Sequence, residues 1–231
     1  MTTSETATAT PRERFREMMR RDILIAARDL VKSGGFSALS MRALAEAVGV
    51  RAPTLYDYFA NKDDVLNALF LEGIAEFRRN FELTAARNPP GAARVISIGL
   101  GYYDFSRANP ELFQLMFGRV DPNYVPGESQ MAASQDLFFS FRDEVAQAVE
   151  QGDFVATDID QLTMLLWAAV HGVVSLEATG FQETCLVGPP RDMAARMLES
   201  IMNGIRGANP DSQRSVSCPI MLSTYPGNGA H

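Results

Sequence analysis

Apolar residues recur at intervals of three and four along most of the chain, which is the spacing that predicts amphipathic α-helices. The first such pattern runs from Pro11 to about Lys32, and its opposite side carries Arg12, Arg16 and Arg20. Its apolar positions are Phe15, Met19, Ile23, Ala26, Ala27, Leu30 and Val31. Strand-like alternation is nearly absent. The sequence therefore predicts an all-α protein.

Two short helices joined by a glycine follow the first helix. Ser40 precedes residues 41–48 and is well placed to cap that helix, because its hydroxyl can accept a hydrogen bond from a first-turn amide. Gly49 can adopt a positive φ and turn the chain. A third helix is expected near Ala52, where Pro53 is tolerated because first-turn amides have no intrahelical partner. Two short helices braced by a longer one predict a helix-turn-helix.

The third helix divides into an anchoring side and a free side at 100° per residue. The expected anchors are Ala52, Leu55 and Phe59. The residues about a quarter of a turn away are Arg51, Thr54 and Tyr58. A guanidinium, a hydroxyl and phenols are hydrogen-bond donors suited to phosphates and base edges in a major groove. A tight corner between two core helices is the alternative interpretation of this stretch.

The rest of the chain predicts further helices and two irregular ends. The expected helices cover residues 62–87, 92–108, 110–117, 128–151, 158–179 and 189–206. Residues 1–10 and 208–231 are polar or rich in turn formers, and both are expected to be flexible. The apolar stretch that begins at Leu162 is shorter than the roughly 20 residues of a membrane span, so we expect a buried or interface helix and no membrane partner.

Charge and cysteine content narrow the class of protein. The net charge is −7, but residues 1–62 hold 10 Lys and Arg against 7 Asp and Glu, whereas the other 169 hold 11 against 21. A net +3 beside a net −10 suggests two modules, of which only the first can approach a polyanion. Cys185 and Cys218 are the two cysteines, and neither a disulfide framework nor a zinc site is indicated. We expect a cytoplasmic protein with no metal and no cofactor.

Residues 23–69, ILIAARDLVKSGGFSALSMRALAEAVGVRAPTLYDYFANKDDVLNAL, resemble the DNA-binding domain of the TetR family of bacterial transcription regulators. The matching positions are Ile23, Ala26, Ala27, Leu30, Gly35, Phe36, Ser40, Leu44, Ala45, Gly49, Val50, Thr54, Leu55, Tyr56, Tyr58, Phe59, Lys62 and Leu66. The resemblance implies a homodimer with a DNA-binding domain over residues 11–60. It also implies a helical domain over residues 61–207 that binds a small ligand and pairs with the partner chain.

The resemblance also assigns DNA contacts. The implied phosphate contacts are Ser40, Tyr56, Tyr58 and Lys62. The implied groove surface consists of Arg42, Arg51, Ala52, Pro53 and Thr54, with Arg42 the candidate for a bidentate guanine contact. Met41 stands where many family members have Thr or Val, which removes a hydroxyl. Asp57 would repel phosphate, so it either reads a cytosine amino group or, as we expect, points away.

The C-terminal half resembles, more loosely, a subgroup with a Trp-His-Gly signature, here Trp167, His171 and Gly172. The candidate ligand-pocket residues are Phe105, Phe113, Met116, Phe117, Phe138, Phe141, Met164, Trp167 and His171, although such residues can equally form plain core. The candidate dimer-interface residues are Gly172, Met193, Met197, Ile201 and Ile205. His171 could contact a ligand, sense pH, join a metal site, or simply pack beside Trp167 with a hydrogen bond.

These observations favour a sequence-specific regulator of transcription, and we expect a repressor. Its partners would be a palindromic double-stranded DNA operator, a second copy of the chain, and a small, mainly apolar effector that releases the DNA. An activator or a ligand-independent regulator would have the same fold. An enzyme that uses the C-terminal cavity is the alternative from another class, but no Ser/His/Asp set, metal cluster or phosphate loop supports it.

Overall fold

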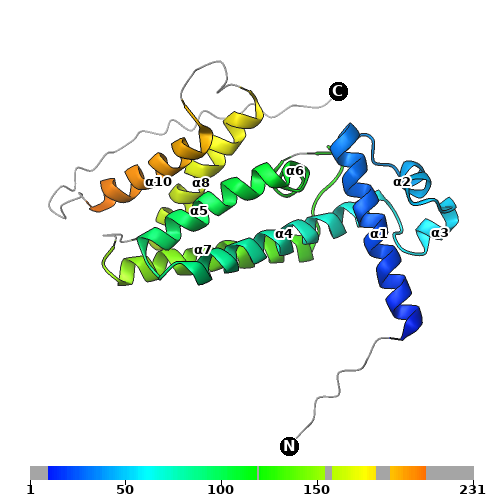
Figure 1. Cartoon of the computed structure of the whole chain (residues 1–231), viewed down its shortest axis with the longest axis horizontal. Helices are drawn as coiled ribbons and strands as arrows, with labels where there is room; N and C mark the ends of the chain where they lie inside the picture. The colour runs from blue at the N-terminus through cyan, green and yellow to red at the C-terminus, as the bar shows by residue number, and fades with distance from the viewer. Residues whose placement is uncertain (1–9, 119, 154–157, 181–187, 207–231) are drawn as a thin grey trace, which may run out of the picture.

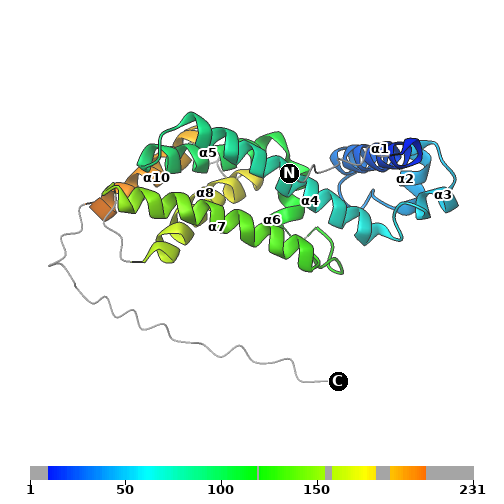
Figure 2. The same cartoon turned by 90° about the horizontal axis from the view of Figure 1, so that it is seen from below.

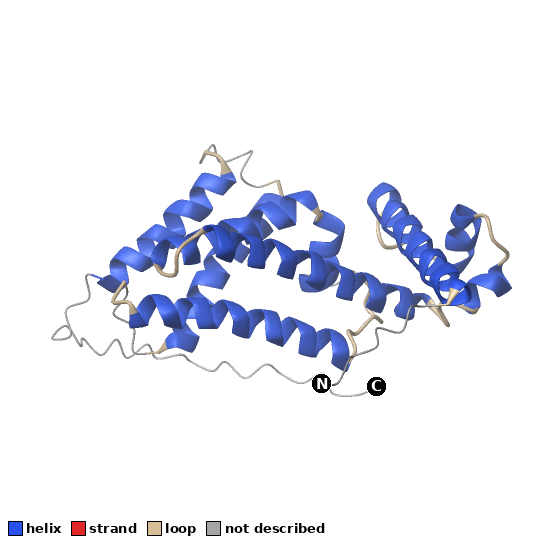
Figure 3. Cartoon of the chain, turned by 60° about the horizontal axis from the view of Figure 1, so that its bottom comes forward, coloured by secondary structure: helices blue, strands red, loops and turns tan. Residues whose placement is uncertain are grey.

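The computed structural model describes residues 10–118, 120–153, 158–180 and 188–206, without the side chains of Ile205 and Arg206. Within these residues every regular element is a helix (Figure 3), which confirms the predicted all-α class. The predicted flexible ends, residues 1–10 and 208–231, lie almost wholly outside the described residues.

The first three helices form a compact group at one end of the molecule (Figure 1). They are α1 (Pro11–Gly34), α2 (Met41–Val48) and α3 (Ala52–Tyr56). Thr10 caps α1 in a reciprocal capping box with Glu13. The Ser40 hydroxyl accepts from the Ala43 amide at 3.1 Å, which confirms the predicted cap. Gly49 ends α2 with φ 75°, the left-handed conformation that favours glycine at this turn.

The anchoring side of α3 is confirmed at two of its three expected positions. Leu55 is fully buried and Phe59 is 2% exposed, and both pack with Leu44 of α2 in the core. Burying each such side chain stabilises the fold by about 1.5–3 kcal/mol. The expectation that Ala52 anchors the helix is wrong, since Ala52 lies at the first position of α3 and is exposed.

The remaining helices form a bundle that α4 joins to the first three (Figures 1 and 2). Their bounds are α4 (Lys62–Arg87), α5 (Ala92–Ala108), α6 (Pro110–Phe117), α7 (Glu128–Glu150), α8 (Ile159–Ala178) and α10 (Pro190–Arg206). The predicted bounds agree within two residues. Asn61 caps α4 by accepting from the Asp64 amide, so the long helix begins directly beside the helix-turn-helix.

Helix α8 contains the apolar stretch that begins at Leu162. It has 20 residues and a mean hydropathy of 1.4, so by length and composition it could cross a membrane, contrary to our expectation. Its contacts with α5, α7 and α10 explain the same composition, since a core helix of a bundle is also apolar on most sides. Glu177 near its end accepts a hydrogen bond from the Tyr103 hydroxyl at 2.9 Å.

An ionic cluster centred on Arg28 fastens α1 to the bundle. The Arg28 guanidinium contacts Glu111 of α6 at 2.9 Å, Glu76 of α4 at 3.3 Å and the Asn109 side chain at 2.7 Å. Lys32 adds a longer contact to Glu111 at 3.5 Å. Because buried charges are tolerated only when paired, these contacts fix how the first helix lies against α4 and α6.

Candidate functional site

The helix-turn-helix presents an open polar surface on α2 and α3. All the side chains of the predicted groove surface are exposed, namely Arg42, Arg51, Ala52, Pro53 and Thr54. Ser40 and Tyr56 are exposed beside them, and Tyr56 keeps 52% of its surface accessible. A short helix whose free side carries guanidinium and hydroxyl groups can enter a major groove and donate hydrogen bonds to base edges and phosphates.

Two arginines of α1 brace the end of α3, a role that the helical spacing of the sequence did not indicate. Arg16 donates to the Asp57 carbonyl and Arg20 to the Tyr58 carbonyl, each at 3.0 Å. The Arg16 guanidinium lies 5.6 Å from the Tyr58 ring centre, and that of Arg20 lies 4.1 Å from the Phe59 ring centre. These contacts hold the half-buried Tyr58 ring in place and satisfy carbonyls that the end of α3 leaves without helical partners.

Lys62 is tied to the bundle rather than free in solvent. Its ammonium donates to Asp121 Oδ2 at 3.1 Å and to the Phe36 carbonyl at 3.3 Å, and 28% of its side chain is exposed. Asp121 lies between α6 and α7, and no sequence pattern indicates this pairing because the two residues are far apart in the chain. A hydrogen bond from the Asn123 amide, and to a smaller extent the Lys62 ammonium, keep the pKa of Asp121 below its ordinary value.

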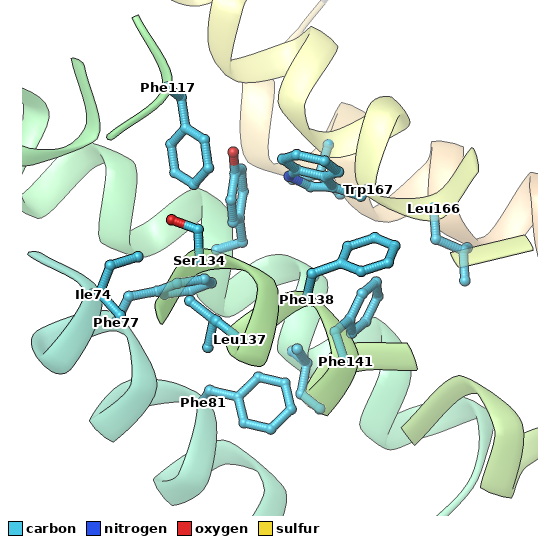
Figure 4. Close-up of a pocket in the computed structure, with 14 residues that line it drawn as sticks. Ile74, Phe77, Phe81, Phe117, Ser134, Leu137, Phe138, Phe141, Leu166 and Trp167 are labelled. Atoms are coloured by element: carbon cyan, nitrogen blue, oxygen red, sulfur yellow. The ribbon is translucent and has the colours of Figure 1, made fainter. Parts of the chain in front are cut away.

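The bundle holds an apolar cavity of about 110 Å³ between α4, α5, α7 and α8, with Phe117 of α6 at one side (Figure 4). Its lining consists of Ile74, Phe77, Phe81, Ile98, Gly99, Tyr102, Phe117, Ser134, Leu137, Phe138, Phe141, Leu166, Trp167 and Val170. None of these side chains carries a formal charge. Such a wall suits an uncharged, mainly apolar molecule, because a charged ligand would lose its hydration without a partner.

The few polar groups of the cavity wall are already paired. The Ser134 hydroxyl donates to the Gln130 carbonyl at 3.0 Å. The Tyr102 oxygen and His171 Nδ1 are 2.7 Å apart. Burial raises the pKa of Tyr102, and the Trp167 indole N–H, a donor to the same oxygen, acts against that rise. Burial also lowers the pKa of His171, because it disfavours the charged form of the ring.

Four of the nine predicted pocket residues line this cavity: Phe117, Phe138, Phe141 and Trp167. Phe105 instead packs against Phe77 in the core. Phe113 lies behind the wall against Phe117, and Met116 lies beside Gly73. Met164 is 48% exposed, because α8 turns Leu166, Trp167 and Val170 toward the cavity and Met164 falls on its outer side.

The residues of α4 and α5 that line the cavity were missed from sequence. Ile74, Phe77 and Phe81 recur at three- and four-residue steps on α4, which is a signal for a buried face but not for a gap beside it. His171 lies behind the wall, with its ring centre 6.0 Å from that of Trp167. Within the described residues no group of three His, Cys, Asp or Glu side chains is placed to hold a metal ion.

Helices α8 and α10 lie side by side, and each exposes apolar side chains. On α8 the exposed members are Met164, Leu165 and Leu176, with the half-buried Gly172 between them. On α10 the predicted interface residue Met197 is 38% exposed, and Met193 and Ile201 are half-buried. The side chain of Ile205 lies outside the described residues. An apolar face of this kind on two packed helices is typical of a protein-protein contact.

Two family models match the chain. The model for the N-terminal domain of "bacterial regulatory proteins, tetR family" matches residues 23–69, which span most of the helix-turn-helix and the start of α4. The model described as "Tetracyclin repressor-like, C-terminal domain" matches residues 95–203, which include most of the bundle. Together the two models cover about two thirds of the chain, and both belong to one family of regulators.

Known proteins agree with these matches. An HTH-type transcriptional regulator of Mycobacterium tuberculosis is 23% identical in an alignment 220 residues long, which covers 81% of this chain and 93% of that protein. A protein of unknown function from Rhodococcus sp. RHA1 superposes with a TM-score of 0.72 at 21% identity, over 88% of this chain and 99% of that one. The TetR family regulator PfmR from Thermus thermophilus superposes with a TM-score of 0.60 at 20% identity, over 81% and 98%. Both structures share this fold.

Proposed function

The chain belongs to the TetR family of DNA-binding transcription regulators, and from this premise we propose that it is a repressor released from a palindromic operator by a small apolar effector. The proposal divides the chain into a DNA-binding domain over residues 11–60 and an effector-binding and dimerisation domain over residues 61–207. The observation that carries it is the uncharged, apolar cavity in the bundle, joined by α4 to the exposed surface of α2 and α3.

The proposed DNA surface consists of phosphate contacts around a reading helix. Ser40, Tyr56 and Tyr58 lie around α3, where their hydroxyls could position the helix on the backbone, and the Lys62 ammonium at the start of α4 would contact a further phosphate. Arg42, exposed at the second position of α2, would read a guanine through two parallel hydrogen bonds. In this assignment the exposed side chains of α3 fit the shape of the groove and make short polar contacts with the DNA.

The proposed dimer forms through the outer face of α8 and α10. Pairing two copies there would bury Met164, Leu165 and Met197, which are otherwise exposed to water at a cost of about 25 cal/mol per Å² of apolar surface. A two-fold dimer presents two copies of α3 about one DNA turn apart, and two-fold protein symmetry calls for a palindromic site.

The proposed effector is uncharged and mainly apolar, because no charged side chain lines the cavity and its polar groups have partners. It would act through α4, which lines the cavity with Ile74, Phe77 and Phe81 and begins at the DNA-binding domain. Movement of α4 would shift the spacing of the two α3 helices. To abolish operator occupancy the effector must favour the non-binding state by roughly 3–5 kcal/mol.

The test is DNA binding by the purified protein. A fluorescent duplex from immediately upstream of its own gene is titrated at two salt concentrations, beside a pool of random sequences for selection. We expect tight, salt-sensitive binding that survives excess random DNA, and a selected sequence that is palindromic. Failure to bind both the upstream duplex and every selected sequence would contradict the proposal.

A further inference from the structure

The ammonium group of Lys62, at the start of α4, already has an anionic partner from the effector-binding domain. Asp121 Oδ2 lies 3.1 Å from Lys62 Nζ, and the two side chains are only 28% and 26% exposed. The Phe36 carbonyl, 3.3 Å from the same nitrogen, holds the lysine on the other side. A half-buried, hydrogen-bonded ion pair is screened less by salt than a pair on the open surface.

Asp121 is held in place by its own segment. Its second oxygen, Oδ1, accepts from the Asn123 amide at 3.0 Å. Three residues later the Tyr124 hydroxyl donates to the Asn67 side chain of α4 at 3.0 Å, and Gln130 donates to the Asn67 carbonyl at 3.1 Å. Residues 121–130 are therefore fastened to the first turns of α4 at both Lys62 and Asn67. Because these contacts already restrict the segment, keeping the Asp121 carboxylate near Lys62 costs little additional side-chain entropy.

Both ends of this segment reach the cavity. Phe117, four residues before Asp121, lines it from α6, and Ser134 lines it from α7. Ser134 also donates to the Gln130 carbonyl at 3.0 Å, so the wall of the cavity and the anchor on Asn67 are two contacts of one helical turn. A change at the cavity can thus reach the carboxylate that faces Lys62.

We propose that Asp121 sets the affinity of the protein for DNA by occupying the Lys62 ammonium that a DNA phosphate would otherwise bind. The inference rests on the proposed function, in which Lys62 contacts the DNA backbone. A carboxylate and a phosphate oxygen are alternative acceptors for the same donor, and a phosphate that approaches Lys62 is also repelled by Asp121. DNA binding therefore has to break or weaken the Lys62 pair, and Asp121 is a positioning residue that lowers affinity.

The first variant is Asp121→Asn, which keeps the shape and removes the charge. We expect its dissociation constant for duplex DNA to fall about threefold to tenfold. The slope of log K against log salt should steepen by up to about one unit, because Lys62 becomes free to neutralise a phosphate. The matched control is Asp136→Asn, which makes the same charge change at an exposed position of α7.

Lys62→Met decides whether the effect passes through the lysine, because methionine keeps an unbranched apolar stem without the ammonium. In the Lys62→Met background, Asp121→Asn should no longer increase affinity, so the double variant binds as the single Lys62→Met variant does. Thermal melts followed by circular dichroism check that the four variants fold as the unmodified protein does. The probes are a duplex selected from random sequence by the unmodified protein, and a random duplex of equal length.

The outcomes separate this inference from the proposed function. If the unmodified protein and all variants fail to bind any duplex, the proposed function is wrong and the inference falls with it. If the unmodified protein binds but Asp121→Asn matches Asp136→Asn in affinity and salt slope, the function stands and the inference is overturned. A gain that persists in the Lys62→Met background also overturns it, because the effect would then be general charge repulsion.

Discussion

The side chains of α2 and α3 that are proposed to contact DNA are exposed. The side chains proposed to bind the effector point inward from α4, α5, α7 and α8 around a cavity. Arg42 and Thr54 are exposed and make no contribution to the core, so they are free to change with the operator. Phe77 and Leu166 serve both the cavity and the core, since each is almost completely buried. A change of DNA preference should therefore cost little stability, and a change of effector should cost more.

The largest effect is expected from Phe59→Ala, which removes the anchor that holds the exposed surface in place. Phe59 is 2% exposed, and losing such a ring costs about 3–5 kcal/mol of unfolding free energy. The stacking of Arg20 on the ring is lost as well. Chemical denaturation followed by circular dichroism measures the loss.

The control for this loss is Phe139→Ala, the same substitution at a ring of α7 that is 55% exposed. Exposed positions change stability by roughly 0.5 kcal/mol or less, so the two variants should differ several-fold. Equal losses at the two positions would mean that burial does not distinguish the anchor of the helix-turn-helix from the surface of the bundle.

Arg42→Ala tests the outer surface itself. It should relax the preference at one base pair in each half-site by about 1–3 kcal/mol and leave the unfolding free energy nearly unchanged. Binding is measured to the selected duplex and to its single-base substitutions. Arg79→Ala, at an exposed position of α4 on the bundle, makes the same change of charge and should leave preference intact. Uniform weakening on all duplexes would make Arg42 a phosphate contact instead.

Ser134→Leu tests the inner surface by filling the cavity. The added carbons occupy the apolar space, so binding of an uncharged naphthylamine dye, measured by fluorescence, should weaken more than tenfold. Stability should change by only about 1 kcal/mol in either direction. Ser140→Leu is the matched control, because both hydroxyls donate to the carbonyl four residues before and Ser140 is outside the lining. Equal dye binding by the two variants would show that the cavity is not the binding site for an apolar ligand, which would contradict the proposal.

The smallest effect concerns pH. Burial lowers the pKa of His171 in the folded protein, so the unfolded chain takes up a proton first as the pH falls. The stability that the neutral His171 ring contributes is fully present above its unfolded pKa of about 6.5. It is lost as the pH falls toward the lower pKa of the folded protein. His171→Gln should flatten the dependence of stability on pH in that window, measured by melts at several pH values. An unchanged profile would show that another group titrates there.

The periodicity of the chain was enough to determine the helices, because helix formation and capping depend on residues three or four positions apart. Ser40 and Gly49 mark ends that the structure confirms. The family resemblance rests on the same short range, since residues 23–69 form one continuous unit. The anchoring role of Leu55 and Phe59 was likewise visible from their spacing.

Tertiary packing alone decided what lies between the helices. A cavity is the space that side chains from several helices fail to fill, so no single periodic pattern distinguishes Phe138, which lines it, from Phe105, which packs in the core. The pairing of Lys62 with Asp121 depends in the same way on two segments that meet only after the chain has folded. The sequence by itself determined which faces are apolar, and the tertiary structure determined which of those faces meet, because packing joins residues that are distant along the chain.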